Sequence, residues 1–325
     1  MNCQMRVAIT VLAAIIGLAW SAPVSLTAQT LTTPWGDPDL QGLWTNTTTT
    51  PLQRPADLSD QEILTAEELA VRDPEVAAAV SFDDPEGRGR GGYNEFWVDR
   101  GNLLSQTSLI VDPPDGRLPA MTRQAQRTHD KFMARWTASP TTYEDLNILD
   151  RCITRGLPGA MIPGFYNHNY LILQTPNYVV LQIEMVHDAR IIPLDGRSHV
   201  QSRIRQWLGD PRGHWEGETL VVETTNFTHI AEQRPNHLGI YFPVLSTGEH
   251  LHFVERFTRV DADTIDYQFT VTDPTVDVRP WTASIPMART DDLLFEYACH
   301  EGNYAMTNGL RGTRAEQQAA DAAKD

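Results

Sequence analysis

The chain has 325 residues, with 42 acidic against 26 basic side chains and a formal net charge of −16. This excess of negative charge repels nucleic-acid phosphates and anionic lipid headgroups, so we expect neither nucleic acid nor a membrane surface as a partner. The length is sufficient for one large domain, or for one domain with a substantial extension. Composition alone predicts no oligomeric state.

Residues 1–28 have the three-part pattern of a secretory signal peptide. Arg6 is their only charged residue, the 14 residues from Val7 to Trp20 form an apolar run, and small residues lead up to Ala28. This run is shorter than the roughly 20 residues that a membrane-spanning helix needs, a retained anchor being the alternative. We expect cleavage near Ala28, no membrane insertion of the mature chain, and a periplasmic or secreted location.

Cleavage removes Cys3 and leaves two cysteines, Cys152 and Cys299. An exported chain matures in an oxidising compartment, where such a pair is expected to form a disulfide. The alternative is two buried free thiols. Neither cysteine is a candidate nucleophile.

Residues 29–149 are rich in proline and glycine and are expected to be an irregular extension with two short helices. One helix is predicted at Thr65–Val80, where Thr65 and Glu68 have the spacing of a capping box and Pro74 is expected to break or kink the helix. The second is predicted at Thr122–Thr137.

Two further stretches are expected to lack a fixed partner. Gly87–Gly92 is glycine-rich but lacks the Lys-Ser/Thr ending of a phosphate-binding loop, which indicates a mobile connector. Residues 306–325 are rich in alanine and charged side chains and are expected to be a flexible or helical tail.

From about Tyr170 to His300 the hydrophobic pattern changes to a period of two, which is typical of half-buried strands, and the barrel domain is expected at residues 150–305. No helix-length pattern separates these strands, so an antiparallel meander is favoured. A long meander leaves two exposed edges unless the sheet closes. The fold is therefore expected to be mainly β, either an up-and-down antiparallel barrel or a strongly curved sandwich. The predicted strands are Tyr170–Gln174, Tyr178–His187, Arg190–Leu194, Arg203–Trp207, Thr219–Phe227, Leu251–Val260, Thr264–Thr272, Trp281–Ala288 and Leu293–Cys299.

Several phrases of the sequence resemble those of a large group of exported bacterial proteins to which no activity is assigned. They occur along nearly the whole mature chain, at Asp37–Trp44, Asp195–Arg197, Trp207–Asp210, Trp215–Phe227 and Tyr297–Asn303. The Gly-x-Trp-x-Gly-x-Thr-Leu segment that leads into a long strand, at Gly213–Leu220, is also similar to lipocalin-like barrels. The resemblance implies an exported lipocalin-like barrel and no particular reaction.

The first candidate site lies on two alternating strands of the predicted barrel. Glu255 falls in the apolar row of Leu251–Val260, and Tyr267 falls in the apolar row of Thr264–Thr272. Across a hairpin these side chains are expected to approach each other in the interior, where a carboxylate must be paired or have its pKa raised. Glu255 and Tyr267 are therefore candidate catalytic residues. The alternative is a structural glutamate that pairs with an arginine, for which the sequence offers Arg203, Arg205 and Arg256.

The second candidate site is the run from Glu184 to Arg190. His187 continues the apolar row of the strand predicted at Tyr178–His187, and Asp188 begins the following turn. A histidine that is oriented by a carboxylate is the usual general base, so both are candidate catalytic residues at the barrel mouth. The alternative is a turn in which Asp188 caps backbone amides while His187 packs.

Four residues are predicted to bind a ligand. Tyr166, Asn167 and His168 precede the first predicted strand, and their aromatic and amide groups suit a sugar or a phenolic ligand. Arg205 is the fourth. The alternative is an ordered polar loop.

Metal and cofactor chemistry receive little support. His250 with His252, and His300 with Glu301, are the close pairs of potential metal ligands, but a pair alone is a weak signal and the motif His-Glu-x-x-His does not occur. The nucleophile motif Gly-x-Ser-x-Gly and a dinucleotide-binding glycine fingerprint do not occur. We expect no metal and no cofactor.

Two functions stay open at this point. The barrel is either a cofactor-free acid–base enzyme (a hydrolase, lyase or isomerase) or a non-catalytic protein that binds a small apolar or partly hydroxylated molecule. A third alternative is an envelope protein whose proline-rich arm docks a partner.

Overall fold

A computed structural model describes residues 31–79, 81, 98–136, 139–146, 148–164, 166–228 and 248–324. The chain divides into two compact units, Met1–Leu31 and Thr32–Asp325, and all the described strands and helices belong to the second. The predicted signal peptide and the run Gly87–Gly92 lie outside the described residues.

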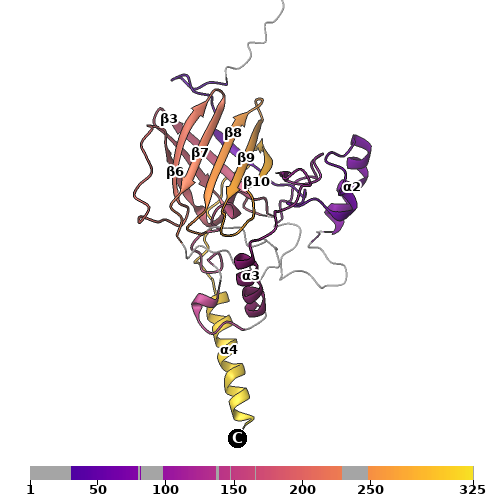
Figure 1. The fold of residues 1–325 in the computed structure, drawn as a ribbon, viewed down its shortest axis with the longest axis vertical. Helices are drawn as coiled ribbons and strands as arrows, with labels where there is room; N and C mark the ends of the chain where they lie inside the picture. The colour runs from indigo at the N-terminus through magenta and orange to yellow at the C-terminus, as the bar shows by residue number, and fades with distance from the viewer. Residues whose placement is uncertain are drawn as a thin grey trace, which may run out of the picture. The chain divides into compact units, whose positions relative to one another are not determined.

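Nine described strands form one antiparallel sheet in the order β5-β4-β3-β1-β10-β9-β8-β7-β6, and this sheet curls into a nearly closed barrel. Figure 1 shows β6 to β10 side by side in one wall. The short strand β2 pairs with β10 next to β1. The bounds are β1 Gly42–Thr45, β2 Ile110–Asp112, β3 Asn169–Thr175, β4 Tyr178–Ile183, β5 Ala189–Pro193, β6 Asp210–Glu216, β7 Thr219–Thr225, β8 His252–Arg259, β9 Thr264–Thr272 and β10 Trp281–Arg289.

Among the described residues, three longer helices and several short 3-10 turns accompany the sheet. The helices are α2 Ala66–Ala79, α3 Arg123–Trp136 and α4 Ala305–Ala322, and the 3-10 turns are η1 Ala56–Leu58, η3 Tyr143–Asp145, η4 Gly159–Met161 and η5 Met185–His187. Helix α4 is the last element of the chain (Figure 1). Within the described residues, no helix combines the length and the apolar character needed to cross a membrane.

The predicted mainly β, antiparallel barrel is confirmed, and so are both helices of the extension. The capping box is present, because Glu68 N donates to Thr65 Oγ1 at 3.2 Å and Thr65 N donates to a Glu68 carboxylate oxygen at 2.8 Å. Pro74 lies inside α2 without dividing it into two elements. The tail expected to be flexible or helical is helical as α4.

The predictions were wrong at four places along the sheet. Arg203–Trp207 and Leu293–Cys299 are not strands. Strand β6 was not predicted, because Pro211 and Gly213 interrupt its apolar alternation. Strand β1 comes from the segment expected to be irregular and pairs with both β3 and β10.

One end of the barrel, called the closed end here, carries the hairpins β3–β4, β6–β7 and β8–β9. Trp44 of β1 is fully buried there, and its Nε1 donates to the Leu40 carbonyl at 2.9 Å. The guanidinium groups of Arg289 and Arg259 lie over its ring at 4.8 and 5.4 Å from the centroid. These cation–π contacts and the large apolar area of the indole stabilise this end.

The opposite end, the far end, is covered by residues 157–162. Tyr170 near the start of β3 donates from its hydroxyl to the Ala160 carbonyl at 3.0 Å, and Asn46 just after β1 donates to the Met161 carbonyl at 2.8 Å. Residues 157 and 160–162 are at most 3 % exposed. This cover therefore packs as part of the core.

The barrel closes at β5 and β6 by side-chain packing, and no hydrogen-bonded ladder joins these two strands among the described residues. A Cβ atom at Gly213 of β6 would lie 2.7 Å from Leu194 Cδ2 and 2.8 Å from Ile192 Cγ2. Glycine is required here because only a residue without a side chain lets β6 approach β5 so closely.

Candidate functional site

The barrel interior holds a charged pair that joins opposite parts of the sheet. Arg190 on β5 donates from one terminal nitrogen to Glu255 Oε1 at 2.8 Å and from the other to Glu255 Oε2. Tyr267 on β9 donates from its hydroxyl to Glu255 Oε1 at 3.0 Å. Thr224 on β7 lies 3.4 Å from Arg190 Nη2 and completes the group, which we call the interior cluster. All four residues are buried.

The sequence places these side chains inside because strand residues two apart share a face. Glu255 lies between the buried Phe253 and Phe257 on β8, and Arg190 precedes the buried Ile192 on β5. The predicted approach of Glu255 and Tyr267 is therefore present. The proposed pairings of Glu255 with Arg203, Arg205 or Arg256 are wrong, since its partner is Arg190.

Burial and charge decide the ionisation of the interior cluster. Burial alone lowers the pKa of Arg190, but the charge and hydrogen bonds of Glu255 more than offset this effect and leave that pKa raised. Burial and then the Glu255 charge hold the pKa of Tyr267 well above its usual value. Arg190 is therefore a cation and Tyr267 a neutral donor at physiological pH, which leaves Tyr267 unsuited to lose a proton.

One donor of the interior cluster has no acceptor. Arg190 Nε is buried and makes no hydrogen bond within the described part of the chain. An unsatisfied buried N–H costs about 1–3 kcal/mol, so its presence beside a satisfied ion pair requires an explanation. A hydroxyl or carbonyl oxygen of a bound molecule is the type of group that satisfies it.

The second candidate site differs from its prediction. Strand β4 ends at Ile183, and His187 lies in the 3-10 turn η5 with a left-handed φ of 63° and an exposed side chain. No hydrogen bond joins His187 to Asp188 among the described residues. The prediction that His187 continues the apolar row of a strand Tyr178–His187 is wrong. The chain turns after Ile183, so His187 does not share a face with the residues of β4.

Asp188 has its own surroundings at the far end. Thr154 Oγ1 donates to Asp188 Oδ2 at 2.7 Å. Burial raises the pKa of the Asp188 carboxyl, and the Thr154 hydrogen bond offsets this rise only in part. A partly buried carboxyl with a raised pKa is a candidate for proton transfer.

Glu184 is the first residue of the run Glu184–Arg190, but it was not predicted as a site residue. It is 1 % exposed, accepts a hydrogen bond from Asn169 Nδ2 at 2.8 Å and accepts another from the backbone N–H of Phe295 at 3.1 Å. Its carboxylate therefore holds the segment after β10 against the start of β3, which is a structural role.

His168 is one of the predicted ligand-binding residues, and it is buried next to Arg155. Its Nε2 lies 2.6 Å from Arg155 Nη1. Burial, and then the charge of Arg155, hold the pKa of His168 well below its usual value. Because the lone pair of Nε2 accepts from the arginine, His168 is a neutral imidazole with no free basic nitrogen on that side.

The other predicted ligand residues are dispersed. Tyr166 packs against the core and lies close enough to Arg155 to affect its pKa. Asn167 has a left-handed φ of 55° just before β3. Arg205 donates to the carbonyls of Phe227 and Glu249, both at 3.1 Å, and ties the loop before β6 to the neighbouring strand ends.

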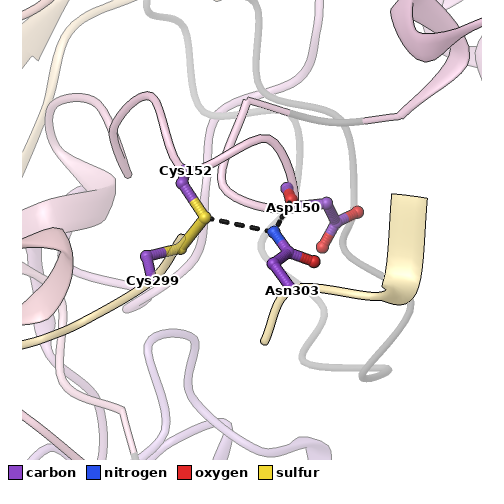
Figure 2. Close-up of a disulfide and its surroundings, with 4 residues drawn as sticks. All are labelled: Asp150, Cys152, Cys299 and Asn303. Atoms are coloured by element: carbon purple, nitrogen blue, oxygen red, sulfur yellow. Dashed lines mark hydrogen bonds between the residues drawn. A yellow bond between two sulfur atoms is a disulfide. The ribbon is translucent and has the colours of Figure 1, made fainter. Parts of the chain in front are cut away.

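The predicted disulfide is present. Cys152 and Cys299 are bonded, with a sequence separation of 147. Figure 2 shows Asn303 beside this bond, where its side-chain amide donates to the Asp150 carbonyl at 3.0 Å and contacts Cys152 Sγ at 3.2 Å. The bond fastens the segment that precedes α4 to the turn before the far-end cover.

The potential metal ligands do not gather. The side chains of His250 and His252 are exposed and lie beside Glu249 and Glu223 respectively, and His300 and Glu301 are exposed as well. Within the described ranges, no group of three or more histidine, cysteine, aspartate or glutamate side chains is arranged to hold a metal ion.

Comparison with protein-family models, with curated proteins and with solved structures finds no match to this chain. Geometry and chemistry therefore carry the functional inference.

Proposed function

We propose that this protein binds one small apolar molecule with a hydrogen-bond acceptor, in the interior of its barrel. The observation that carries the proposal is the unpaired Nε–H of Arg190. That donor is held in place by the two bonds of Arg190 to Glu255. A positioned donor in an apolar setting is the usual way in which a binding site orients a small ligand.

The surroundings of the interior cluster support this ligand class. The rings of Phe257 and Tyr267 lie 4.7 Å apart, and those of Phe253 and Phe269 lie 5.2 Å apart. Aromatic walls favour an apolar body, while Arg190 Nε favours one oxygen atom. This combination suits a phenol, an alcohol or a ketone.

The interior cluster supports binding better than catalysis. Both carboxylate oxygens of Glu255 are engaged, by two nitrogens of Arg190 and by the Tyr267 hydroxyl. A general acid or base instead needs a carboxyl oxygen that is free to face the substrate. We therefore place the non-catalytic ligand-binding function first.

The test uses phenol and toluene as probes, because both have an aromatic ring and only phenol has an oxygen. The Kd of each is measured by titration calorimetry on the mature protein, on Arg190→Lys and on Arg256→Lys. Lysine keeps a cation beside Glu255 but lacks the Nε donor. Arg256 is the matched control, since it lies on β8 next to Glu255 and forms a surface pair with Glu216.

We expect phenol binding to weaken about tenfold in Arg190→Lys, the equivalent of roughly 1.4 kcal/mol for one hydrogen bond. Toluene binding should stay unchanged, and neither probe should respond to Arg256→Lys. Equal phenol affinity in all three proteins would overturn the proposal. Native mass spectrometry of the exported protein then identifies the natural ligand as a co-purifying mass.

Asp188 supports a second candidate function, acid–base catalysis at the far end. Its pKa is raised, it is only partly buried, and one hydroxyl contacts it. Once a substrate is found, Asp188→Asn should remove turnover. Thr154→Val should raise the pKa seen in the rate profile, because it deletes the bond that favours the charged form. An unchanged rate in Asp188→Asn would exclude this function.

A further inference from the structure

Arg54, in the segment between β1 and α2, is a buried arginine whose guanidinium group has no partner. The residue is 7 % exposed, and its Nε is buried without a hydrogen bond. Its backbone N–H donates to the Gly116 carbonyl at 2.8 Å, which fixes the position of the residue. The absence of a partner holds for the described part of the chain, where the Arg54 side chain forms no ion pair and no hydrogen bond.

The packing around Arg54 holds the guanidinium in place. Gly116 has a left-handed φ of 69°, and a Cβ atom there would lie 3.0 Å from Arg54 Nε and 2.4 Å from Ser108 Oγ. A backbone without a side chain therefore lies against one side of the arginine. The Ser108 hydroxyl lies nearby and donates to the Ile110 carbonyl at 2.8 Å, and no hydrogen bond joins it to Arg54 among the described residues.

A charge in this setting is expensive unless an opposite charge accompanies it. Buried arginines in proteins are normally paired, because removal of a cation from water costs several kcal/mol. The chain has 42 acidic residues, yet no carboxylate of the described residues contacts Arg54. A neutral side chain at this position would avoid that cost, so the presence of arginine points to an anion that comes from outside the chain.

We propose that Arg54 is the centre of a binding site for a small oxyanion, a carboxylate or a phosphate. The planar guanidinium donates two parallel hydrogen bonds to such groups, which is a geometry that lysine does not offer. Arg54 Nε is buried and unpaired, whereas neither terminal nitrogen is both buried and unpaired. An anion therefore reaches the guanidinium from the side of its terminal nitrogens. This site is separate from the interior cluster.

The experiment uses inorganic phosphate and acetate as probes on the mature protein, at constant ionic strength with chloride as the replaced anion. Kd is measured by titration calorimetry for the wild type, Arg54→Gln, Arg54→Lys and the control Arg279→Gln. Arg279 is an exposed arginine just before β10 and is paired with Asp112. We expect saturable binding that weakens at least tenfold in Arg54→Gln, weakens less in Arg54→Lys and does not change in Arg279→Gln. A preference for acetate assigns a carboxylate ligand, and a preference for phosphate assigns a phosphate ligand.

Thermal unfolding keeps the proposal falsifiable where binding is weak. In chloride buffer Arg54→Gln should unfold at the wild-type temperature or above it, because it removes an unpaired buried charge. Phosphate should raise the melting temperature of the wild type more than that of Arg54→Gln. Phosphate also stabilises folded proteins in general, and comparison of the two variants removes this common effect. Equal affinity in the wild type and Arg54→Gln would overturn the proposal. An equal fall of the melting temperature in both buffers would overturn it too, since the fold itself would then be holding the arginine.

Discussion

Arg190 and Glu255, 65 residues apart in the sequence, form a bidentate ion pair inside the barrel. Arg190 lies on β5, an end strand of the sheet order, whereas Glu255 lies on β8. The pair therefore fastens the end strand to the opposite part of the barrel, where no backbone ladder does so among the described strands. The same contact orients the Nε–H of Arg190, on which the proposed ligand site depends.

Loss of one partner of this pair should be costly. Glu255→Gln keeps the shape of the side chain but leaves the buried cation of Arg190 uncompensated, so we expect the free energy of unfolding to fall by roughly 3–5 kcal/mol. Urea unfolding of the mature protein measures this change. The double variant Arg190→Met with Glu255→Leu should recover most of the loss, because it removes both charges.

The control for this prediction is the surface pair of Glu216 and Arg256, which joins β6 to β8 at 2.9 Å with both side chains about half exposed. Glu216→Gln should change stability by less than about 1 kcal/mol. Wild-type stability of Glu255→Gln would show that the interior pair contributes nothing.

The sequence predicted the barrel, the disulfide and the approach of Glu255 to Tyr267, because each follows from a local pattern. Alternation placed both side chains inward, and two cysteines admit one pairing. The same alternation applies to Arg190, because it lies two residues before the apolar Ile192 and so shares its inward face. The pairing of β5 with the opposite wall is a long-range contact, however, and no local pattern encodes it. Arg155 lies in an irregular segment without periodicity, so its contact with His168 was not predictable.

Asp277, after β9, should make stability depend on pH. Burial, opposed by a hydrogen bond from Trp281 Nε1 at 3.2 Å and reinforced by the charge of Asp273, raises its pKa from 3.8 to about 6. The folded state therefore binds this proton more tightly than the unfolded state does. Its contribution to stability is fully present below pH 3.8 and is lost as the pH rises through about 6.

Asp277→Asn mimics the protonated carboxyl at every pH, so it should be more stable than the wild type above pH 6 and equal to it near pH 4. Unfolding midpoints over this range measure the difference. Asp291→Asn, at an exposed position, serves as the control and should show no such trend. A constant difference between Asp277→Asn and the wild type across the range would refute the assignment.

Gly164 should tolerate no side chain. A Cβ atom there would lie 2.1 Å from His168 Nε2, so Gly164→Ala must displace the imidazole and disrupt its contact with Arg155. We expect a loss of about 1–3 kcal/mol or more, measured by thermal unfolding. In Gly312→Ala the new methyl group on α4 meets nothing within 4 Å, and this change should stabilise the helix by about 0.5–1 kcal/mol. Equal effects of the two changes would contradict the packing described for His168.

The disulfide should contribute strongly because it closes a long loop. With a sequence separation of 147 between the two cysteines, the chain-entropy description gives roughly 4–5 kcal/mol for Cys152–Cys299. The double variant Cys152→Ser with Cys299→Ser should lose about this much in urea unfolding. The wild type with a reductant should behave like the double variant, and insensitivity of the wild type to the reductant would count against the bond.

The nitrogen-15 NMR signal of the Arg190 Nε–H group, in mature protein labelled at arginine, tests the proposed ligand site most directly. The signal is assigned by its disappearance in Arg190→Lys. On saturation with phenol, it should shift and exchange with water more slowly, because the phenol oxygen accepts from Nε. The Arg256 signal should stay in place. A saturable phenol complex in which the Arg190 signal does not move would contradict the site, since the ligand would then bind elsewhere.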